Sequence, residues 1–234
     1  MEWLSTNSKI WTFGGNYLAS LESYYNPLGL PAFTIRLRYP DGVTPTFRYG
    51  TAVQVTASPN VWDLTYNNTN WNYLLGGDHD LVEVLGANTA GVTNMGIMFT
   101  HCSNLETCAV FDTRDVTNMS NFMNNCSSLL EVPPFDTSKV ENFLDAFIGC
   151  VGLRQIPFLS TVSAKNVTQM FAWCKYVYSG ALAMYNSMKN NTNITDHYQT
   201  FYLCGCSTPT GHAELANIPV SWVGEGGYDW DEPD

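Results

Sequence analysis

Apolar residues recur every 24 positions through the middle of this 234-residue chain. The segment Val92-Thr93-Asn94-Met95 returns as Val116-Thr117-Asn118-Met119 and as Val140-Glu141-Asn142-Phe143, with a looser copy at Ala164-Lys165-Asn166-Val167. A cysteine stands seven residues after the fourth position of each copy. So many columns in one register do not arise by chance, and the pattern predicts a repeat protein whose units stack on one another.

The same positions of each repeat are apolar, and we expect them to form one continuous core. They comprise columns of methionine or phenylalanine, of cysteine and of leucine or valine, and a displaced copy follows near residue 201. The predicted core residues are Met95, Phe99, Cys102, Leu105, Met119, Met123, Cys126, Leu129, Phe143, Phe147, Cys150, Leu153, Phe171, Cys174, Val177, Phe201 and Cys204.

The spacing within one repeat predicts a short helix followed by a short strand. Met95, Phe99 and Cys102 lie three or four positions apart, which is typical of one apolar face of a helix. The Leu-x-x-Val segment that follows favours a short strand, ended by prolines such as Pro134 and Pro157. We therefore expect an α/β repeat, a leucine-rich-repeat-like solenoid of 24-residue turns whose strands form a parallel sheet.

Two further columns carry polar or reactive atoms. We interpret the cysteines as small apolar core groups, because each occupies the same site in its repeat. Seven cysteines cannot all pair as disulfides, and Cys204-x-Cys206 is too weak a pattern for a metal site. A column of asparagines is expected to form a stacked ladder or to cap the turns by bonding to the backbone. It consists of Asn94, Asn118, Asn142 and Asn166.

The flanks differ from the repeats and divide the chain into four parts. Residues 1–32 are aromatic without a clear period, and we expect a docking segment there. Residues 33–67 contain two alternating runs, which predict a β-hairpin or small sheet that caps the stack. The solenoid is predicted over 68–206, with a helical insertion near 179–190, and residues 207–234 are expected to form a C-terminal cap and an acidic tail.

Composition and charge restrict the partners. Charged residues are 13% of the chain and the formal net charge is −11, so we expect neither nucleic acid nor an anionic membrane as partner. No apolar run is long enough to insert across a membrane. The first residues show no export signal and no lipobox cysteine, which favours a protein that is not exported by the usual route.

The sequence offers little for catalysis. The four histidines are scattered, and no phosphate-binding loop, nucleophile elbow or zinc motif is present. Asp78-His79-Asp80 is the one compact cluster of metal-ligand types, and a polar turn accounts for it more simply. We therefore expect no catalytic residue, no cofactor and no metal. An enzyme, such as a glycan hydrolase with paired carboxylates, is the least favoured alternative.

The run Val-Thr-Asn-Met-x-x-Met-Phe-x-x-Cys-x-x-Leu, followed by Phe-Asp-Thr, resembles the repeat of BspA-type leucine-rich surface proteins. The resemblance covers roughly residues 68–177 and the displaced turn at 194–206. Members of that family occur in gut Bacteroidetes, mycoplasmas and some protists, often as adhesive surface proteins. The resemblance therefore implies a binding surface and leaves the ligand open.

The flanks are similar to proteins of gut bacteriophages and prophages, in the segments 11–18, 27–31, 41–47 and 211–219. This similarity implies a virion component, in a tail fibre or on the capsid, that forms a homo-oligomer within an assembly. Its partners would be other virion proteins and a host cell-surface protein or glycan. The alternative is a bacterial cell-surface adhesin of the BspA type whose export signal is missing from this sequence. Both are non-enzymatic structural and recognition proteins.

Overall fold

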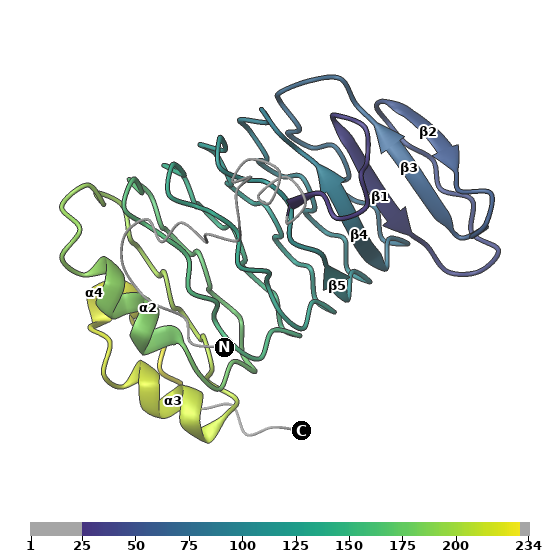
Figure 1. Ribbon diagram of the computed structural model, residues 1–234. Coiled ribbons are helices and arrows are strands. Elements are labelled where there is room, and N and C mark those ends of the chain that lie inside the picture. Colours follow the sequence, from purple (N-terminus) through teal and green to yellow (C-terminus); the bar gives the residue numbers. More distant parts are fainter. Residues whose placement is uncertain (1–24, 230–234) are drawn as a thin grey trace, which may run out of the picture.

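The part of the chain that the structure describes has a small sheet at one end, a stack of 24-residue turns in the middle and three short helices at the other end (Figure 1). This computed structural model describes residues 25–229, so most of the predicted docking segment and the end of the acidic tail lie outside the described residues. The elements are β1 (Thr34–Arg38), β2 (Thr51–Gln54), β3 (Val61–Thr65), β4 (Glu83–Asn88), β5 (Thr107–Cys108), α2 (Ala181–Met188), α3 (Pro209–Leu215) and α4 (Val220–Val223).

The strands form one mixed sheet in the order β2-β3-β1-β4-β5. β1 lies antiparallel between β3 and β4, and β2 pairs with β3 rather than with β1. The two runs that alternate in the sequence are therefore in one small sheet without being hairpin partners. Ile35 and Leu37 of β1 and Leu64 of β3 are fully buried and join the sheet to the main core.

Backbone hydrogen bonds join each turn of the stack to the next. The N–H of Met95 donates to the carbonyl oxygen of Asn118 at 3.0 Å, and the N–H of Ile97 donates to that of Ser120 at 2.8 Å. The N–H groups of residues 99 and 101 continue this row at 2.8 and 2.7 Å. Every second N–H group of the segment therefore points along the stack. The same row of four bonds begins at Trp71, Met119, Phe143 and Val167.

The predicted α/β solenoid with one helix and one strand per turn is wrong. In the segment expected to be helical, every second N–H group donates to the next turn and those of residues 98, 100 and 102 donate to the carbonyl three residues back, so none makes the helical bond to the carbonyl four residues back. It folds instead as tandem β-turns, in which the N–H of Cys102 donates to the oxygen of Phe99 at 3.0 Å. Ile97 and His101 occupy the third position of these turns with φ of 58° and 60°, as a type II turn requires. Because one turn follows another every four residues, the inward side chains acquire helix-like spacing without a helix.

The strand predicted for each repeat is also mostly absent. β4 and β5 pair in parallel over two residues, and later turns in the described chain show isolated bridges such as Gln155 with Ser179. Pro134 and Pro157 lie in these segments and have no N–H group to contribute to a ladder. The described chain is therefore mostly β, with one five-stranded mixed sheet and three short helices.

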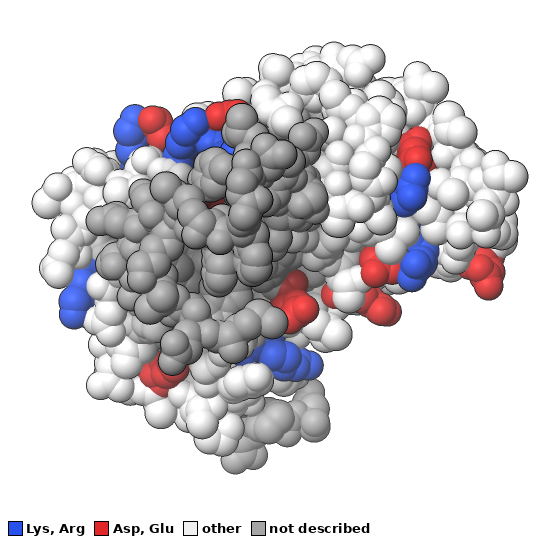
Figure 2. Space-filling model, in the orientation of Figure 1, with Lys and Arg blue, Asp and Glu red and all other residues white. Residues whose placement is uncertain are grey.

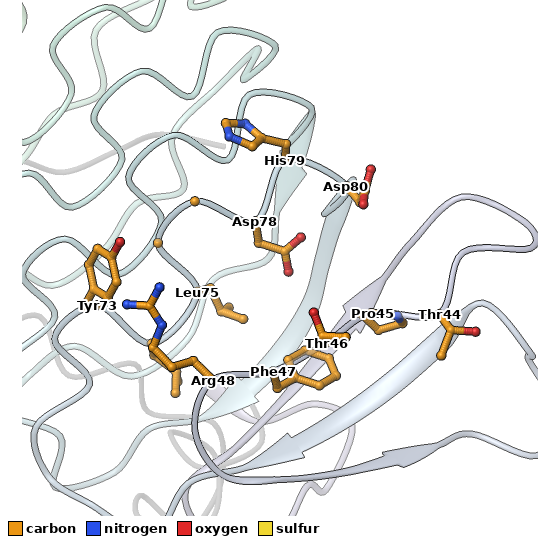
Figure 3. Close-up of a pocket in the computed structure, with 13 residues that line it drawn as sticks. Thr44, Pro45, Thr46, Phe47, Arg48, Tyr73, Leu75, Asp78, His79 and Asp80 are labelled. Carbon is orange, nitrogen blue, oxygen red and sulfur yellow. The ribbon is translucent and has the colours of Figure 1, made fainter.

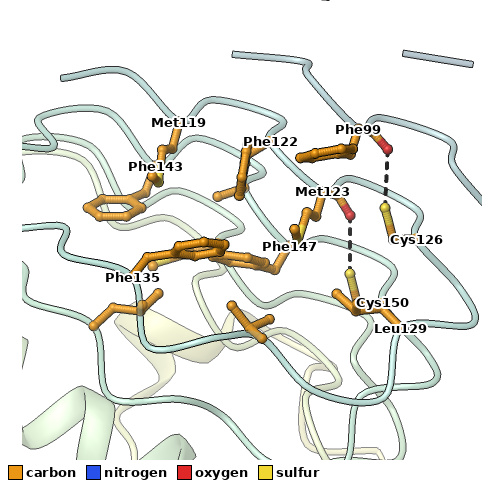
Figure 4. Packing of buried hydrophobic residues seen from close by; sticks show 14 of the residues in the cluster. Phe99, Met119, Phe122, Met123, Cys126, Leu129, Phe135, Phe143, Phe147 and Cys150 are labelled. Atoms are coloured by element: carbon orange, nitrogen blue, oxygen red, sulfur yellow. Dashed lines mark hydrogen bonds between the residues drawn. The ribbon is translucent and has the colours of Figure 1, made fainter. Parts of the chain in front are cut away.

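The predicted core residues all lie fully buried in one hydrophobic cluster. Phenylalanine rings of successive turns pack against one another, as Figure 4 shows around Phe122 and Phe147. The centroid of the Phe122 ring lies 5.5 Å from that of Phe99 and 6.4 Å from that of Phe147. Phe147 in turn stacks on Phe171 at 5.3 Å. The core of each turn is therefore completed by its neighbours.

The cysteine column forms a ladder of thiol hydrogen bonds inside this core (Figure 4). The Sγ atom of Cys126 donates to the carbonyl oxygen of Phe99 at 3.1 Å, and that of Cys150 donates to the oxygen of Met123 at 3.2 Å. Each thiol thus bonds to the turn before its own. All seven cysteines are free thiols.

The asparagine column holds the corner at which each turn begins. The side-chain oxygen of Asn94 accepts the N–H of Gly96 at 2.9 Å, and the amide Nδ2 of Asn118 donates to the same oxygen at 2.9 Å. The oxygens of Asn142 and Asn166 likewise accept the N–H two residues further on. These short-range bonds fix the backbone where the column forms parallel bridges between turns.

The C-terminal end of the stack is closed by α2, α3, α4 and the segment that follows α4. The carboxylate of Glu214 in α3 accepts the N–H groups of Gly180 and Leu182 at the start of α2, at 3.3 and 3.1 Å. The N–H groups of Phe201 and Leu203, which would bond to a further turn, donate instead to the oxygens of Trp222 and Gly227 at 3.1 Å each. These donors of the last turn therefore have partners without a further repeat.

Candidate functional site

The outward-facing positions of the turns form columns whose chemistry changes along the stack. One column passes from Ser103 and Ser127 through Val151 to Lys175, although the cysteine next to each of these residues is unchanged. The neighbouring outward columns change in the same way, from His101 to Trp173 and from Asn104 to Tyr176. The frame is thus constant inside and variable outside, which is the arrangement that a stacked repeat uses for recognition.

The most unusual part of this surface is an aromatic corner made by Trp173, Lys175, Tyr176 and Tyr178. The exposed fractions of Trp173, Tyr176 and Tyr178 are 41%, 39% and 48%. The three residues alternate with the buried Cys174 and Val177, which keeps their rings directed outward. Exposed aromatic side chains that gather in this way are typical of binding surfaces.

Contacts with neighbouring side chains hold the rings of the aromatic corner in place. Tyr202 of the following turn lies 5.3 Å from Trp173 between ring centroids. The Nζ atom of Lys175 lies 5.6 Å from the Trp173 ring, and the guanidinium of Arg154 lies 5.3 Å from the Tyr176 ring. Because such contacts restrict the rings before any partner arrives, less conformational entropy is lost on binding.

Most of the surface in Figure 2 is uncharged, and its Lys and Arg atoms often lie beside Asp or Glu atoms. Two of the ion pairs link successive turns: Lys139 with Asp115 at 2.8 Å and Lys165 with Glu141 at 2.7 Å. These pairs are exposed to solvent and contribute little to stability. The described residues in this view therefore form no continuous surface of one charge sign.

A pocket of about 550 Å³ opens at the other end of the stack, between the loop that joins β1 to β2 and the first turn. We call it the end pocket. Figure 3 shows the loop residues on one side of it and the first turn on the other. Its lining consists of residues 44–48 and 73–80, which include Thr44, Thr46, Phe47, Arg48, Tyr73, Leu74, Gly76, Asp78, His79 and Asp80.

Hydrogen bonds and ring contacts fix several side chains of the end pocket. The hydroxyl of Tyr39 donates to Oδ2 of Asp78 at 2.6 Å, and the Arg48 guanidinium lies 4.5 Å from the centroid of the Tyr73 ring. Burial raises the pKa of Asp78 above its usual value, although the hydrogen bonds that its carboxylate accepts act in the opposite direction. Burial and the neighbouring Asp78 raise the pKa of Tyr39 far above its usual range. The Tyr39 phenol therefore remains a neutral donor at physiological pH.

The cluster Asp78-His79-Asp80 lies in the end pocket, but its side chains do not converge on one point. The Tyr39 hydroxyl donates to the Asp78 carboxylate, whereas Nδ1 of His79 lies 3.2 Å from the hydroxyl of Ser103 in the next turn. Within residues 25–229, no group of three or more His, Cys, Asp or Glu side chains is arranged to hold a metal ion.

The buried thiols are poorly suited to nucleophilic chemistry. Burial raises the pKa of Cys150 to about 12 and that of Cys102 further, so both thiols are protonated at neutral pH. The carbonyl oxygens that accept their hydrogens also hold the sulfur atoms in the core. The predicted core residues therefore position the outward columns and do not form a site themselves.

Sequence reasoning identified Asp78, His79 and Asp80 as a cluster but missed the other side of the end pocket. Arg48 and Phe47 belong to a loop about 30 residues earlier, and nothing in its sequence indicates where the loop packs. The usable signal was Tyr73, an aromatic residue in a turn that departs from the repeat, because departures from a repeat often mark a terminal or binding unit.

Comparison with protein families identifies the class to which this chain belongs. Residues 67–187, a little more than half of the chain, match the family described as "Mycoplasma protein of unknown function, DUF285", and the chain belongs to that family. Comparisons with the curated proteins and with the solved structures gave no match. Among the described residues, no helix has the length and apolar character needed to cross a membrane. The matched region begins just before the first turn and ends within α2.

Proposed function

We propose that this protein is a non-enzymatic recognition protein of the BspA type, which uses its outward columns to contact another surface. The observation that carries this proposal is the contrast between constant inner columns and variable outer ones, from Cys102 to Cys174 inside and from His101 to Trp173 outside. A frame of this kind keeps its shape while its exposed residues diversify. BspA-like repeat proteins are associated with the matched family, which supports the same function.

The aromatic corner is the main contact surface in this proposal. Trp173, Tyr176 and Tyr178 supply large, partly apolar rings, and Lys175 and Arg154 lie against them. Tryptophan, tyrosine and arginine are the residues that most often dominate the energy of an interface. The partner is a protein or glycan on a host cell.

We also propose a bacteriophage virion as the setting, on the basis of the sequence similarity of the flanks to phage proteins. Mass spectrometry of purified virions tests this setting, and finding no peptides of the protein would refute it. An upstream reading frame that encodes a lipobox signal would instead support a cell-surface adhesin.

The recognition function is tested by measuring how much fluorescently labelled protein binds to cells of candidate host bacteria. The variant Trp173→Ala/Tyr176→Ala/Tyr178→Ala should lose at least about tenfold in apparent affinity, since each ring is a candidate hot spot. Phe158→Ala is the matched control, because Phe158 is an exposed aromatic residue outside the corner. Equal binding by the triple variant, the control and the unmodified protein would refute the assignment of the aromatic corner.

A further inference from the structure

The first turn of the stack has a row of carbonyl groups that lacks the partners found in the following turns. In the second turn, the carbonyl oxygens of Asn94, Gly96, Met98 and Thr100 accept the N–H groups of residues 71, 73, 75 and 77. The equivalent oxygens of the following turns are occupied in the same way. In the first turn the equivalents belong to Asn70, Asn72, Leu74 and Gly76, and none of the residues that the structure describes donates a hydrogen bond to them.

Two of these carbonyl groups, those of Leu74 and Gly76, belong to residues that line the end pocket. The first turn has the same conformation as the later ones, with φ of 64° at Tyr73 and 84° at Gly77 and a turn bond from the N–H of Leu74 to the oxygen of Trp71. Its carbonyl groups therefore point away from the second turn, as the carbonyl groups of every later turn point toward the turn before. The Leu74 and Gly76 carbonyl oxygens therefore give the pocket wall two hydrogen-bond acceptors.

The opposite wall supplies donors and an apolar surface. Thr44 and Thr46 contribute hydroxyl groups from the loop between β1 and β2, and Arg48 contributes a guanidinium. Phe47 and Tyr73 contribute aromatic rings. Figure 3 shows Thr46 and Phe47 across the pocket from Asp78, with Arg48 beside Tyr73. A ligand in this space meets acceptors on one side and donors on the other.

Few ligand classes satisfy both walls. An anion without donors would leave the carbonyl row unpaired and would lie close to Asp78 and Asp80. A hydrocarbon would leave every polar group of the lining unpaired. A hydroxyl group both donates and accepts, and a sugar ring adds apolar C–H faces that pack on aromatic rings. The volume of about 550 Å³ lies within the range of small-ligand sites, roughly 300–1,000 Å³.

We propose that the end pocket binds a single neutral sugar unit, whose hydroxyl groups donate to the open carbonyl row of the first turn. Thr44 and Thr46 donate to the sugar oxygens from the opposite wall. The Arg48 guanidinium, which the Tyr73 ring holds in position, lines the same wall of the pocket. This site is separate from the aromatic corner, which lies at the other end of the stack. The recognition function proposed above does not depend on it.

The test is saturation-transfer difference NMR with the full chain, using methyl glycosides of glucose, galactose, mannose and N-acetylglucosamine at about 1 mM. At least one glycoside should bind. A deoxyfluoro analogue of that sugar, which cannot donate a hydrogen bond at the replaced position, should bind about tenfold more weakly at one or more positions. Binding by every analogue equal to that of the parent sugar would overturn the role of the carbonyl row.

Protein variants locate the bound sugar within the molecule. Thr46→Val removes one hydroxyl of the end pocket with little change of shape and should weaken sugar binding about fivefold to tenfold, whereas Thr192→Val, an exposed threonine outside the pocket, should have no effect. The triple variant of the aromatic corner should bind the sugar normally. The proposal is wrong if no glycoside binds, or if inorganic phosphate at the same concentration displaces the bound glycoside.

Discussion

Replacing Phe122 with alanine should destabilise the protein more than most single substitutions in its core. The Phe122 side chain is fully buried, and its ring centroid lies 5.5, 5.8 and 6.4 Å from those of Phe99, Phe135 and Phe147. These neighbours belong to the turns before and after as well as to its own. Deleting a buried phenylalanine ring costs about 3–5 kcal/mol, and the three ring contacts favour the upper half of that range.

The assay is equilibrium unfolding in urea, followed by far-ultraviolet circular dichroism and by tryptophan fluorescence. Two probes are needed because a stack of repeats can unfold in parts, and coincident transitions show that one free energy of unfolding applies. Phe158→Ala is the control, since Phe158 is 71% exposed and its loss should change the free energy by less than about 0.5 kcal/mol. A loss below about 1 kcal/mol for Phe122→Ala would refute the argument that its ring links successive turns.

Three further predictions follow from the turns themselves. Because the pKa of Cys150 is about 12, iodoacetamide at pH 8 should leave the thiols of the cysteine column unmodified in the native protein and alkylate them in urea. Intact mass counts the alkylated thiols, and rapid alkylation of the native protein would contradict this prediction. Ile97 has a positive φ that its branched side chain disfavours, so Ile97→Asn should raise the free energy of unfolding by about 1 kcal/mol. A lower free energy of unfolding for this variant in urea would show that the packing of the Ile97 side chain outweighs the backbone strain. Burial acts to raise the pKa of Asp112, but its hydrogen bonds with Arg114 outweigh burial and lower it. Ionised Asp112 therefore stabilises the fold above its unfolded-state pKa, and this stability is lost as the pH falls through its folded-state pKa. The stability difference between the wild type and Asp112→Asn should shrink from pH 7 to pH 3, and a constant difference would count against the pairing.

The sequence was most informative about which side chains lie inside. A 24-residue period places Met95, Phe99 and Cys102 in register with later copies, and burial of these columns follows from stacking whatever the local backbone does. The backbone itself was not predictable from that spacing. A helix and a series of four-residue turns both bring every third or fourth side chain to one face, so the pattern does not distinguish them.

A local signal for the turns does exist, but it is incomplete. Asn121, Asn125 and Asp145 occupy positions with positive φ, which asparagine and aspartate tolerate better than most residues. Ile97 and Trp173 occupy equivalent positions and give no such signal, because the hydrogen bonds between turns impose the conformation there. The end pocket was less predictable still, since it depends on where a loop from the sheet packs against the first turn.

The hydrogen bonds between turns fix the distance between any two places on the stack by the number of turns that separate them. His79 and Asp80 of the end pocket occupy the same two columns as Lys175 and Tyr176 of the aromatic corner, four turns later. Neighbouring chains paired in this way lie about 4.8 Å apart, which separates the two places by roughly 19 Å. Duplication of one 24-residue unit would lengthen that separation by a fixed step and leave the chemistry at both ends unchanged. The number of turns is therefore a property on which selection can act independently of the residues that make contact.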